Sequence, residues 1–304
     1  MKIHLITNCT NLKKSNIKGK IQLKNLIENN SAQTIVNSWC EKLEKAEQKA
    51  PANEVYAGDH WKVAKSIIKP NLELWVLSAG YGLIHSSSQI GSYDATFSSG
   101  SENSINKSGL TNSEWWNTLH QRRNSDVFKC ESLHSLVSIN TDDIFFIAAS
   151  PDYLKVIQDE LKQLVLEKKL TNENFFIVSS KHKISEQLIP YYLESKADFC
   201  STLKGGRVSL NIRLAKYLLG ESEVNVFESK NVIDKYNDLE ANAIKLLVNN
   251  RQKLSDEEVI SFIKNELDIH QGTKASASML LKNLRNKNLA CEQKRFSRLL
   301  KDLL

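Results

Sequence analysis

The sequence predicts an α/β fold: a parallel-type sheet with helices on both faces, followed by a basic helical module. Short apolar segments alternate with amphipathic ones in the first part of the chain, and strand patterns stop beyond about residue 230. Strands that are apolar throughout are typical of parallel sheets covered on both faces. The 304 residues suffice for two domains, which we place at residues 1–228 and 229–304.

Four segments have the length and composition of buried strands. They are Lys2–Thr7, Leu72–Ser78, Asp143–Ala149 and Asn174–Ser179. In parallel sheets, ligands bind at the carboxyl ends of the strands. The loops after residues 7, 78, 149 and 179 are therefore the first places to look for a site.

Helical spacing of apolar residues predicts helices over 31–48 and Tyr153–Glu167. The second has Ser150 as its N-cap and Pro151 at its first helical position, which is a typical start.

The C-terminal part has four helical patterns, at about 236–250, 255–267, 273–287 and 291–303. Ser255 and Glu258 have the spacing of a capping box. Two short helices around a turn at Gly272-Thr273 resemble a helix-turn-helix or winged-helix unit. Any small helical bundle could produce the same pattern.

The net charge of +6 is concentrated at the C-terminal end. Eight basic residues lie between Gln271 and Leu304 against two acidic ones, which accounts for the whole excess. A basic block on a helical unit favours an anionic polymer as partner. We expect Lys274, Lys282 and Arg285 to contact DNA; the alternative is a solvated helical face.

Several classes of protein are disfavoured. No apolar run has the length of a membrane span, and the short apolar start reads as a strand rather than a signal peptide. Five scattered cysteines indicate a reducing, cytoplasmic environment. The histidines lack metal-ligand spacing, and the glycine motifs of dinucleotide and P-loop sites are absent. We expect no metal and no cofactor; the oligomeric state stays open.

The segment Val76–Phe97 combines glycines, tyrosines and a carboxylate. Glycines after a strand let the backbone turn close to a ligand. A stackable ring and a carboxylate suit recognition of a planar base. We predict that the site contains Ser78, Tyr81, Tyr93 and Asp94. The residues alone equally allow a loop whose aspartate caps a helix and whose tyrosines pack.

Part of this segment resembles a known signature. Leu77–Ile84 followed by Tyr93-Asp94 is similar to the "LSAKYGLL … YD" pattern of the peroxide-stress protein family and its relatives of unknown function. Ile6–Thr10 with Lys13-Lys14 resembles the family's opening strand and "CSKSK"-type loop, and Tyr56–Gly58 resembles its tyrosine before a helix. Gly80 stands where many relatives have lysine, so no role of that lysine carries over.

Some proteins with this domain resemble uracil-DNA glycosylases, and an anti-phage DNA glycosylase that removes a modified cytosine is the closest functional picture. In that class a carboxylate follows the first core strand, and a serine- or histidine-containing loop follows a later one. The resemblance implies that Asp94 orients water or stabilises positive charge on the sugar. It implies that Ser150-Pro151 forms part of the second loop.

A second candidate segment is Thr202–Arg213. Two glycines can free backbone amides, and arginine suits phosphate recognition. The predicted nucleic-acid contacts are Lys204, Gly205, Gly206, Arg207, Ser209, Asn211 and Arg213. The alternative is a turn that leads into a helix through Leu214–Leu219, with its arginines in solvent.

These observations favour a DNA glycosylase that excises a modified base, for example a modified cytosine of phage DNA, and leaves an abasic site in anti-phage defence. One alternative is a non-catalytic DNA-binding stress-response protein. Another is a nucleotide- or nucleoside-processing enzyme whose C-terminal helices bind a protein partner. The first hypothesis depends on a spatial prediction: the SAGYG turn, Asp94 and the Lys204–Arg207 segment should line one cavity.

Overall fold

The computed structural model of the protein describes residues 1–14, 19–28, 30–121, 132–220, 227–245, 251–269 and 276–303. The chain divides into two compact units, residues 1–244 and 245–304. The boundary lies later than the one expected after residue 228. Helix α10 (Ser229–Ala241) explains the difference, because it buries Val232, Tyr236 and Leu239 in the core of the first unit.

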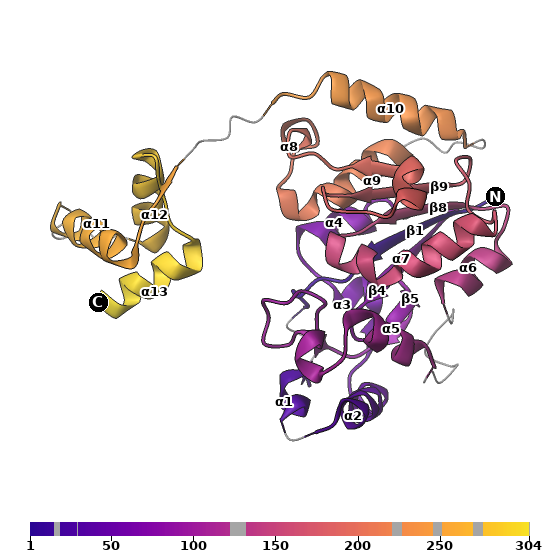
Figure 1. Ribbon diagram of the computed structural model, residues 1–304, viewed down its shortest axis with the longest axis horizontal. Helices are drawn as coiled ribbons and strands as arrows, with labels where there is room; N and C mark the ends of the chain where they lie inside the picture. The colour runs from indigo at the N-terminus through magenta and orange to yellow at the C-terminus, as the bar shows by residue number, and fades with distance from the viewer. Residues whose placement is uncertain are drawn as a thin grey trace. The chain divides into compact units, whose positions relative to one another are not determined.

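A six-stranded sheet forms the centre of the first unit (Figure 1). Its order is β10-β9-β8-β1-β4-β5, and only the β4–β5 pair is antiparallel. The strands are β1 (Ile3–Asn8), β4 (Leu72–Ser78), β5 (Gly82–His85), β8 (Ile144–Ala148), β9 (Phe175–Ser179) and β10 (Tyr192–Glu194). The four strands expected from the sequence are confirmed to within one residue at each end.

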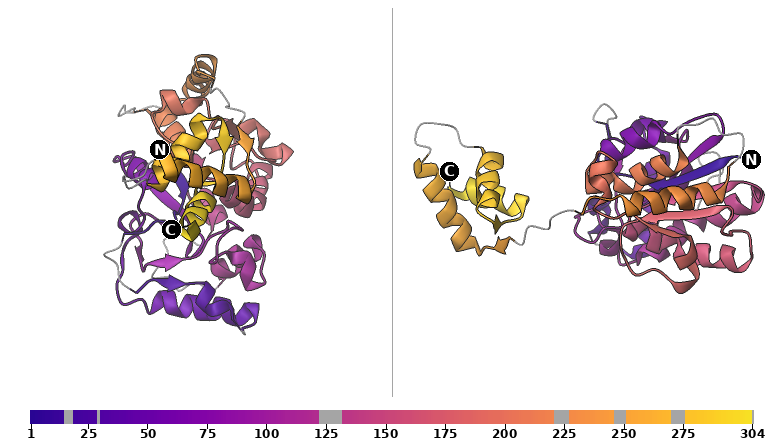
Figure 2. Two further views of the ribbon diagram at one scale, coloured as in Figure 1. Left: turned by 90° about the vertical axis from the view of Figure 1, so that its left-hand side faces the viewer. Right: turned by 90° about the horizontal axis from the view of Figure 1, so that it is seen from above.

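Helices cover both faces of this sheet, as predicted (Figures 1 and 2). The connections from β1 to β4 and from β8 to β9 run in opposite directions along the sheet. Right-handed crossovers then place their helices on opposite faces. The first layer contains α4 (Asp59–Lys65), α9 (Leu210–Leu219) and α10, and the second contains α5 (Asn112–Gln121), α6 (Leu133–Ile139) and α7 (Pro151–Leu166).

The strand order also fixes where a ligand can bind. After β5 the chain returns to β8 on the other side of β1. The neighbours β1 and β8 are thus a topological switch point, where the loops at the carboxyl ends diverge and leave a crevice.

Short elements surround the sheet. Two two-stranded pairs join β2 (Ile21–Gln22) to β7 (Tyr93–Asp94) and β3 (Ala50–Pro51) to β6 (Gln89–Ile90). The short helices are α1 (Lys24–Ile27), α3 (Ala52–Val55), α8 (Phe199–Thr202), η1 (Ile105–Ser108), η2 (Glu186–Tyr191) and η3 (Arg207–Ser209); α2 (Ala32–Glu44) is longer.

In its described residues, the second unit contains three helices and a parallel strand pair. Its elements are β11 (Gln252–Lys253), α11 (Asp256–Ile269), α12 (Ala277–Asn286), β12 (Leu289–Ala290) and α13 (Gln293–Leu303). The capping box is confirmed: the Ser255 amide donates to Glu258 at 2.7 Å, and the Glu258 amide donates to Ser255 Oγ at 3.2 Å. The Gly272-Thr273 turn and Lys274 lie outside the described residues.

None of the described helices combines the length and apolarity that crossing a bilayer requires.

Candidate binding cleft

A cleft of about 570 Å³ opens at the carboxyl ends of β1 and β8. Its walls are the loop after β1 (residues 8–12), the first turns of α4 and α7, Ser180 after β9, and part of η3 and α9. Its volume is within the range of small-molecule sites. The cleft lies where the loops after residues 7, 149 and 179 were expected to meet, whereas the loop directly after residue 78 does not line it.

A buried histidine forms part of the cleft wall. His60 Nε2 lies 2.8 Å from Thr7 Oγ1, and the Thr7 hydroxyl donates to the Ala148 carbonyl at 2.6 Å. Since that hydroxyl has a single proton, Nε2 of His60 is the donor and Nδ1 is left as an acceptor. Burial lowers the pKa of His60 to about 4, so the ring is neutral at neutral pH.

Two asparagine side chains in the cleft are fixed by the turn between β8 and α7. Asn8 Oδ1 accepts from the Ser150 amide at 3.0 Å. Asn211 Nδ2 donates to the Ala149 carbonyl at 2.7 Å, and its Oδ1 accepts from the Ser195 hydroxyl. Asn211 therefore lies in the cleft, as predicted, with its amide already oriented.

The cleft contains two carboxylates with different surroundings. Asp59 accepts from Arg213 Nη2 at 2.8 and 2.9 Å and from the Ser209 hydroxyl, and these hydrogen bonds lower its pKa. Asp152, in the first turn of α7, is half-buried and makes no hydrogen bond or ion pair within the described parts of the chain. Asp152 is thus the carboxylate that a ligand or water can use.

The Thr202–Arg213 segment reaches the cleft through Arg207, Val208 and Asn211. Its other predicted contacts have structural roles or lie elsewhere. Arg213 and Ser209 are engaged with Asp59, and Lys204 is exposed away from the residues that line the cleft.

The two glycines of this segment differ. A Cβ on Gly205 would lie 2.0 Å from Arg213 Nε, whereas a Cβ on Gly206 would meet nothing within 4 Å. Gly205 therefore makes room for the Arg213 side chain, which is a different role from the predicted phosphate contact.

The SAGYG turn is buried rather than open to a base. Ser78, Tyr81 and Tyr93 are at most 3% exposed. Ser78 Oγ accepts from the Tyr81 amide at 2.9 Å and lies 2.7 Å from the Tyr93 hydroxyl. Burial raises the pKa of Tyr81 and Tyr93. The prediction that these rings stack on a nucleobase is not supported, because they have no open face for it.

Asp94 also lies outside the cleft. It belongs to the short strand β7, and its carboxylate forms an ion pair with Lys20 at 2.9 Å. Beyond it, Thr96 and Ser98 do reach the cleft. The spatial prediction thus holds for part of the Thr202–Arg213 segment and fails for the SAGYG turn and Asp94.

Cys9 links the cleft to the buried tyrosines. Its sulfur lies 3.0 Å from the Tyr153 hydroxyl, and both residues line the cleft. Burial, and then Cys9, raises the pKa of Tyr93. The buried tyrosines of the motif therefore have a structural function in the core and do not line the cleft.

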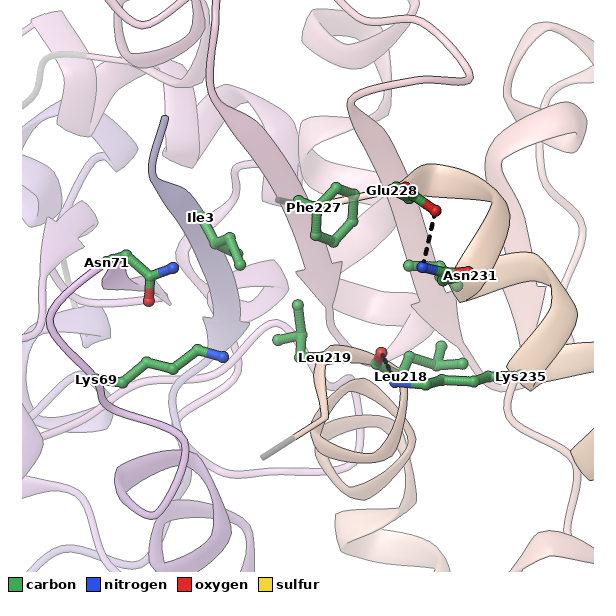
Figure 3. Close-up of a pocket in the computed structure, with 10 residues that line it drawn as sticks. Ile3, Lys69, Asn71, Leu218, Leu219, Phe227, Glu228, Asn231 and Lys235 are labelled. Atoms are coloured by element: carbon green, nitrogen blue, oxygen red, sulfur yellow. Dashed lines mark hydrogen bonds between the residues drawn. The ribbon is translucent and has the colours of Figure 1, made fainter. Parts of the chain in front are cut away.

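A second hollow, of about 60 Å³, lies near the start of β1, at the opposite ends of the strands (Figure 3). Lys69 and Lys235 reach toward it from opposite sides. Lys235 Nζ donates to the Leu218 carbonyl at 3.4 Å. This hollow has room for a few waters but not for a nucleotide.

Sequence reasoning missed His60, Asp59, Asp152 and Val208. Asp59 and His60 follow Gly58, whose positive φ of 91° begins α4. Asp152 follows Ser150-Pro151 at the start of α7, and no local pattern marks it as a site residue. Within the described residues, no group of three or more His, Cys, Asp and Glu side chains could hold a metal ion.

These features define an α/β protein with a polar cleft at the switch point of a mostly parallel sheet. Residues 40–172 match the model of a family of unknown function, DUF6884. The matched region contains Asp59, His60 and Asp152 but neither the loop after β1 nor η3. Comparisons with curated proteins and with solved structures gave no match.

Proposed function

We propose that the protein is a DNA glycosylase, with its active site in the cleft at the carboxyl ends of β1 and β8. The observation that carries the proposal is the Asp152 carboxylate, which lines the same cleft as neutral His60 and the oriented side chains of Asn8 and Asn211. Asp152 makes no ion pair within the described residues. Hydrolysis of an N-glycosidic bond needs a carboxylate near the sugar and polar groups around the base.

In the proposed reaction, Asp152 orients a water and stabilises the positive charge that develops on the sugar as the bond to the base weakens. The water oxygen bonds to C1′, the C1′–N bond breaks, and the base leaves with a proton that ultimately comes from the water. Asn8 and Asn211 hold fixed amide groups near the reacting nucleotide, and Arg207 at the rim meets a flanking phosphate.

Two residues at the rim of the cleft favour a substrate base that is extruded from the DNA duplex. Val208 is 93% exposed, next to Arg207 on the same turn. An apolar side chain with a neighbouring cation suits insertion into a duplex, where it fills the space of an extruded base. The resemblance of the N-terminal motifs to glycosylase-related proteins supports a uracil-DNA glycosylase-like fold and a modified base in phage DNA as substrate.

The test compares Asp152→Asn with Asp94→Asn. Both proteins are incubated with DNA that carries modified cytosines, and abasic sites are detected as strand breaks after alkali. We expect the wild type and Asp94→Asn to produce breaks and Asp152→Asn to lose at least about 10²-fold in rate.

Equal activity of Asp152→Asn and the wild type would remove Asp152 from the mechanism. DNA binding by the wild type without any breaks would instead favour the non-catalytic stress-response alternative.

A further inference from the structure

We propose that helix α13 binds the phosphate backbone of duplex DNA through Lys294, Arg298 and Lys301, here called the basic stripe. This inference rests on the proposed function, because it names the surface that holds the substrate polymer. All three residues lie in the second unit.

The basic stripe occupies one face of α13. Its residues are spaced i, i+4 and i+7, which places them in a row on a helix. The opposite face carries Phe296, Leu299 and Leu300, all buried in the core of the unit. The stripe therefore points away from the core, and at 1.5 Å per residue its ends are about 10 Å apart along the helix.

Two other basic residues of this unit, Arg295 and Lys287, are already used in its fold. Arg295 donates to Asp256 at 2.6 Å and to the Leu254 carbonyl at 3.0 Å. Lys287 pairs with the buried Glu266 at 2.8 Å, and its Nζ lies 5.1 Å from the centre of the Phe262 ring. These two side chains are neutralised by carboxylates within the unit, whereas the residues of the basic stripe are not.

The stripe residues lack such partners. All three are exposed, and no ion pair of their side chains is found in the described part of the chain. The adjacent Glu292 uses its carboxylate to accept from the backbone amides of Lys294 and Arg295. Asp302, four residues after Arg298, is exposed and forms no ion pair with the stripe in the described part of the chain. Three cations in a row, none of them in an ion pair, match the repeated negative charge of a nucleic-acid backbone.

The composition favours duplex over single-stranded DNA. Residues 245–304 contain two aromatic side chains, Phe262 and Phe296. Phe296 is fully buried, and Phe262 is half-buried beside Lys287. Proteins that hold single strands stack bases on exposed rings, and this unit offers no such ring among its described residues.

The experiment measures binding of the full-length protein to an unmodified DNA duplex by fluorescence anisotropy over a series of salt concentrations. The test variant carries Lys294→Gln, Arg298→Gln and Lys301→Gln. A control carries Lys42→Gln, Lys45→Gln and Lys49→Gln on the first unit, all exposed, so that the total charge changes equally. A third protein, with Lys294→Arg, Arg298→Lys and Lys301→Arg, keeps the stripe's charge.

For the test variant we expect the slope of log K against log salt to fall by about 2.7, and affinity at about 0.1 M salt to fall by roughly 10²-fold or more. The control and the charge-keeping protein should bind as the wild type does, and thermal unfolding should be unchanged in all three because the stripe is exposed. An unchanged slope in the test variant, or an equal loss in the Lys42 control, would overturn the proposal.

The result is separable from that of the glycosylase assay. Binding that depends on the stripe, in a protein that makes no abasic sites, would leave this inference standing while the proposed activity fails. Abasic-site formation without any role of the stripe in binding would do the reverse. Preference of the wild type for single-stranded DNA or for RNA over the duplex would also overturn the assignment.

Discussion

Arg213 forms an ion pair with Asp59, in which the single nitrogen Nη2 donates to both carboxylate oxygens, at 2.8 and 2.9 Å. The pair joins α9 to the first turn of α4, and the Ser209 hydroxyl donates to the same carboxylate. Because Ser209 ends η3, this contact fixes the turn that presents Arg207 and Val208 at the cleft rim. The ion pair is partly exposed, so its contribution is positional more than energetic.

The first prediction concerns the glycine beside this ion pair. In Gly205→Ala the new methyl group would lie 2.0 Å from Arg213 Nε and displace the guanidinium from Asp59. We expect a loss of about 1 kcal/mol in the free energy of unfolding, measured with urea, and a lower rate of abasic-site formation. Gly206→Ala is the matched control, since its methyl group meets nothing; equal effects of the two would contradict this role of Gly205.

Local pattern predicted the fold well because the central strands are mostly apolar and are buried along almost their whole length. Leu72–Ser78 and Phe175–Ser179 could be located from composition alone, and α7 from Ser150-Pro151. The boundary expected after residue 228 differs from the observed one because α10 has the polar surface of a peripheral helix, while its three buried residues belong to the core of the first unit and α10 packs on α9.

The site was harder to predict, because its residues come together only through the topology. Asp59 and Arg213 are far apart in the chain, and no local pattern indicates that they pair. The SAGYG segment has the composition of a binding loop, yet two buried indoles hold it inside the protein: Trp39 donates to the Gly80 carbonyl at 2.9 Å, and Trp115 donates to the Ala79 carbonyl at 2.8 Å.

The second prediction follows from the packing of that turn. A Cβ on Gly80 would lie 2.7 Å from the ring of Tyr93, which is completely buried and hydrogen-bonded. The ring has no room to move, so Gly80→Ala should lower the free energy of unfolding by about 1–3 kcal/mol. Gly100→Ala, where a Cβ meets nothing, should have little effect. Many proteins with a similar signature have lysine at the position of Gly80. A Gly80→Lys protein as stable as the wild type would contradict the prediction, because it would show that the turn can rearrange.

The third prediction concerns stability at acid pH. Burial lowers the pKa of His60 from 6.5 to about 4, so the unfolded chain takes up this proton more readily than the folded one. The resulting stability is present above pH 6.5 and is lost as the pH falls toward 4, by up to about 3 kcal/mol. His60→Gln removes this titration and should flatten the dependence of unfolding free energy on pH between these values. The same decline in wild type and variant would assign it to other groups, such as His4, whose pKa burial also lowers.

The fourth prediction tests Val208 as the residue that enters a duplex. The Val208 side chain is 93% exposed and is not part of the core, so Val208→Ser should leave thermal stability unchanged. If the Val208 side chain fills the gap left by an extruded base, the variant should form abasic sites in duplex DNA roughly 10-fold more slowly than the wild type. In single-stranded DNA the two rates should be equal, because the base does not have to be extruded from a duplex. Ile68→Ser, at another exposed apolar residue remote from the cleft lining, serves as the control. An equal loss on both forms of DNA would mean that Val208 contacts the substrate inside the cleft and does not enter the duplex.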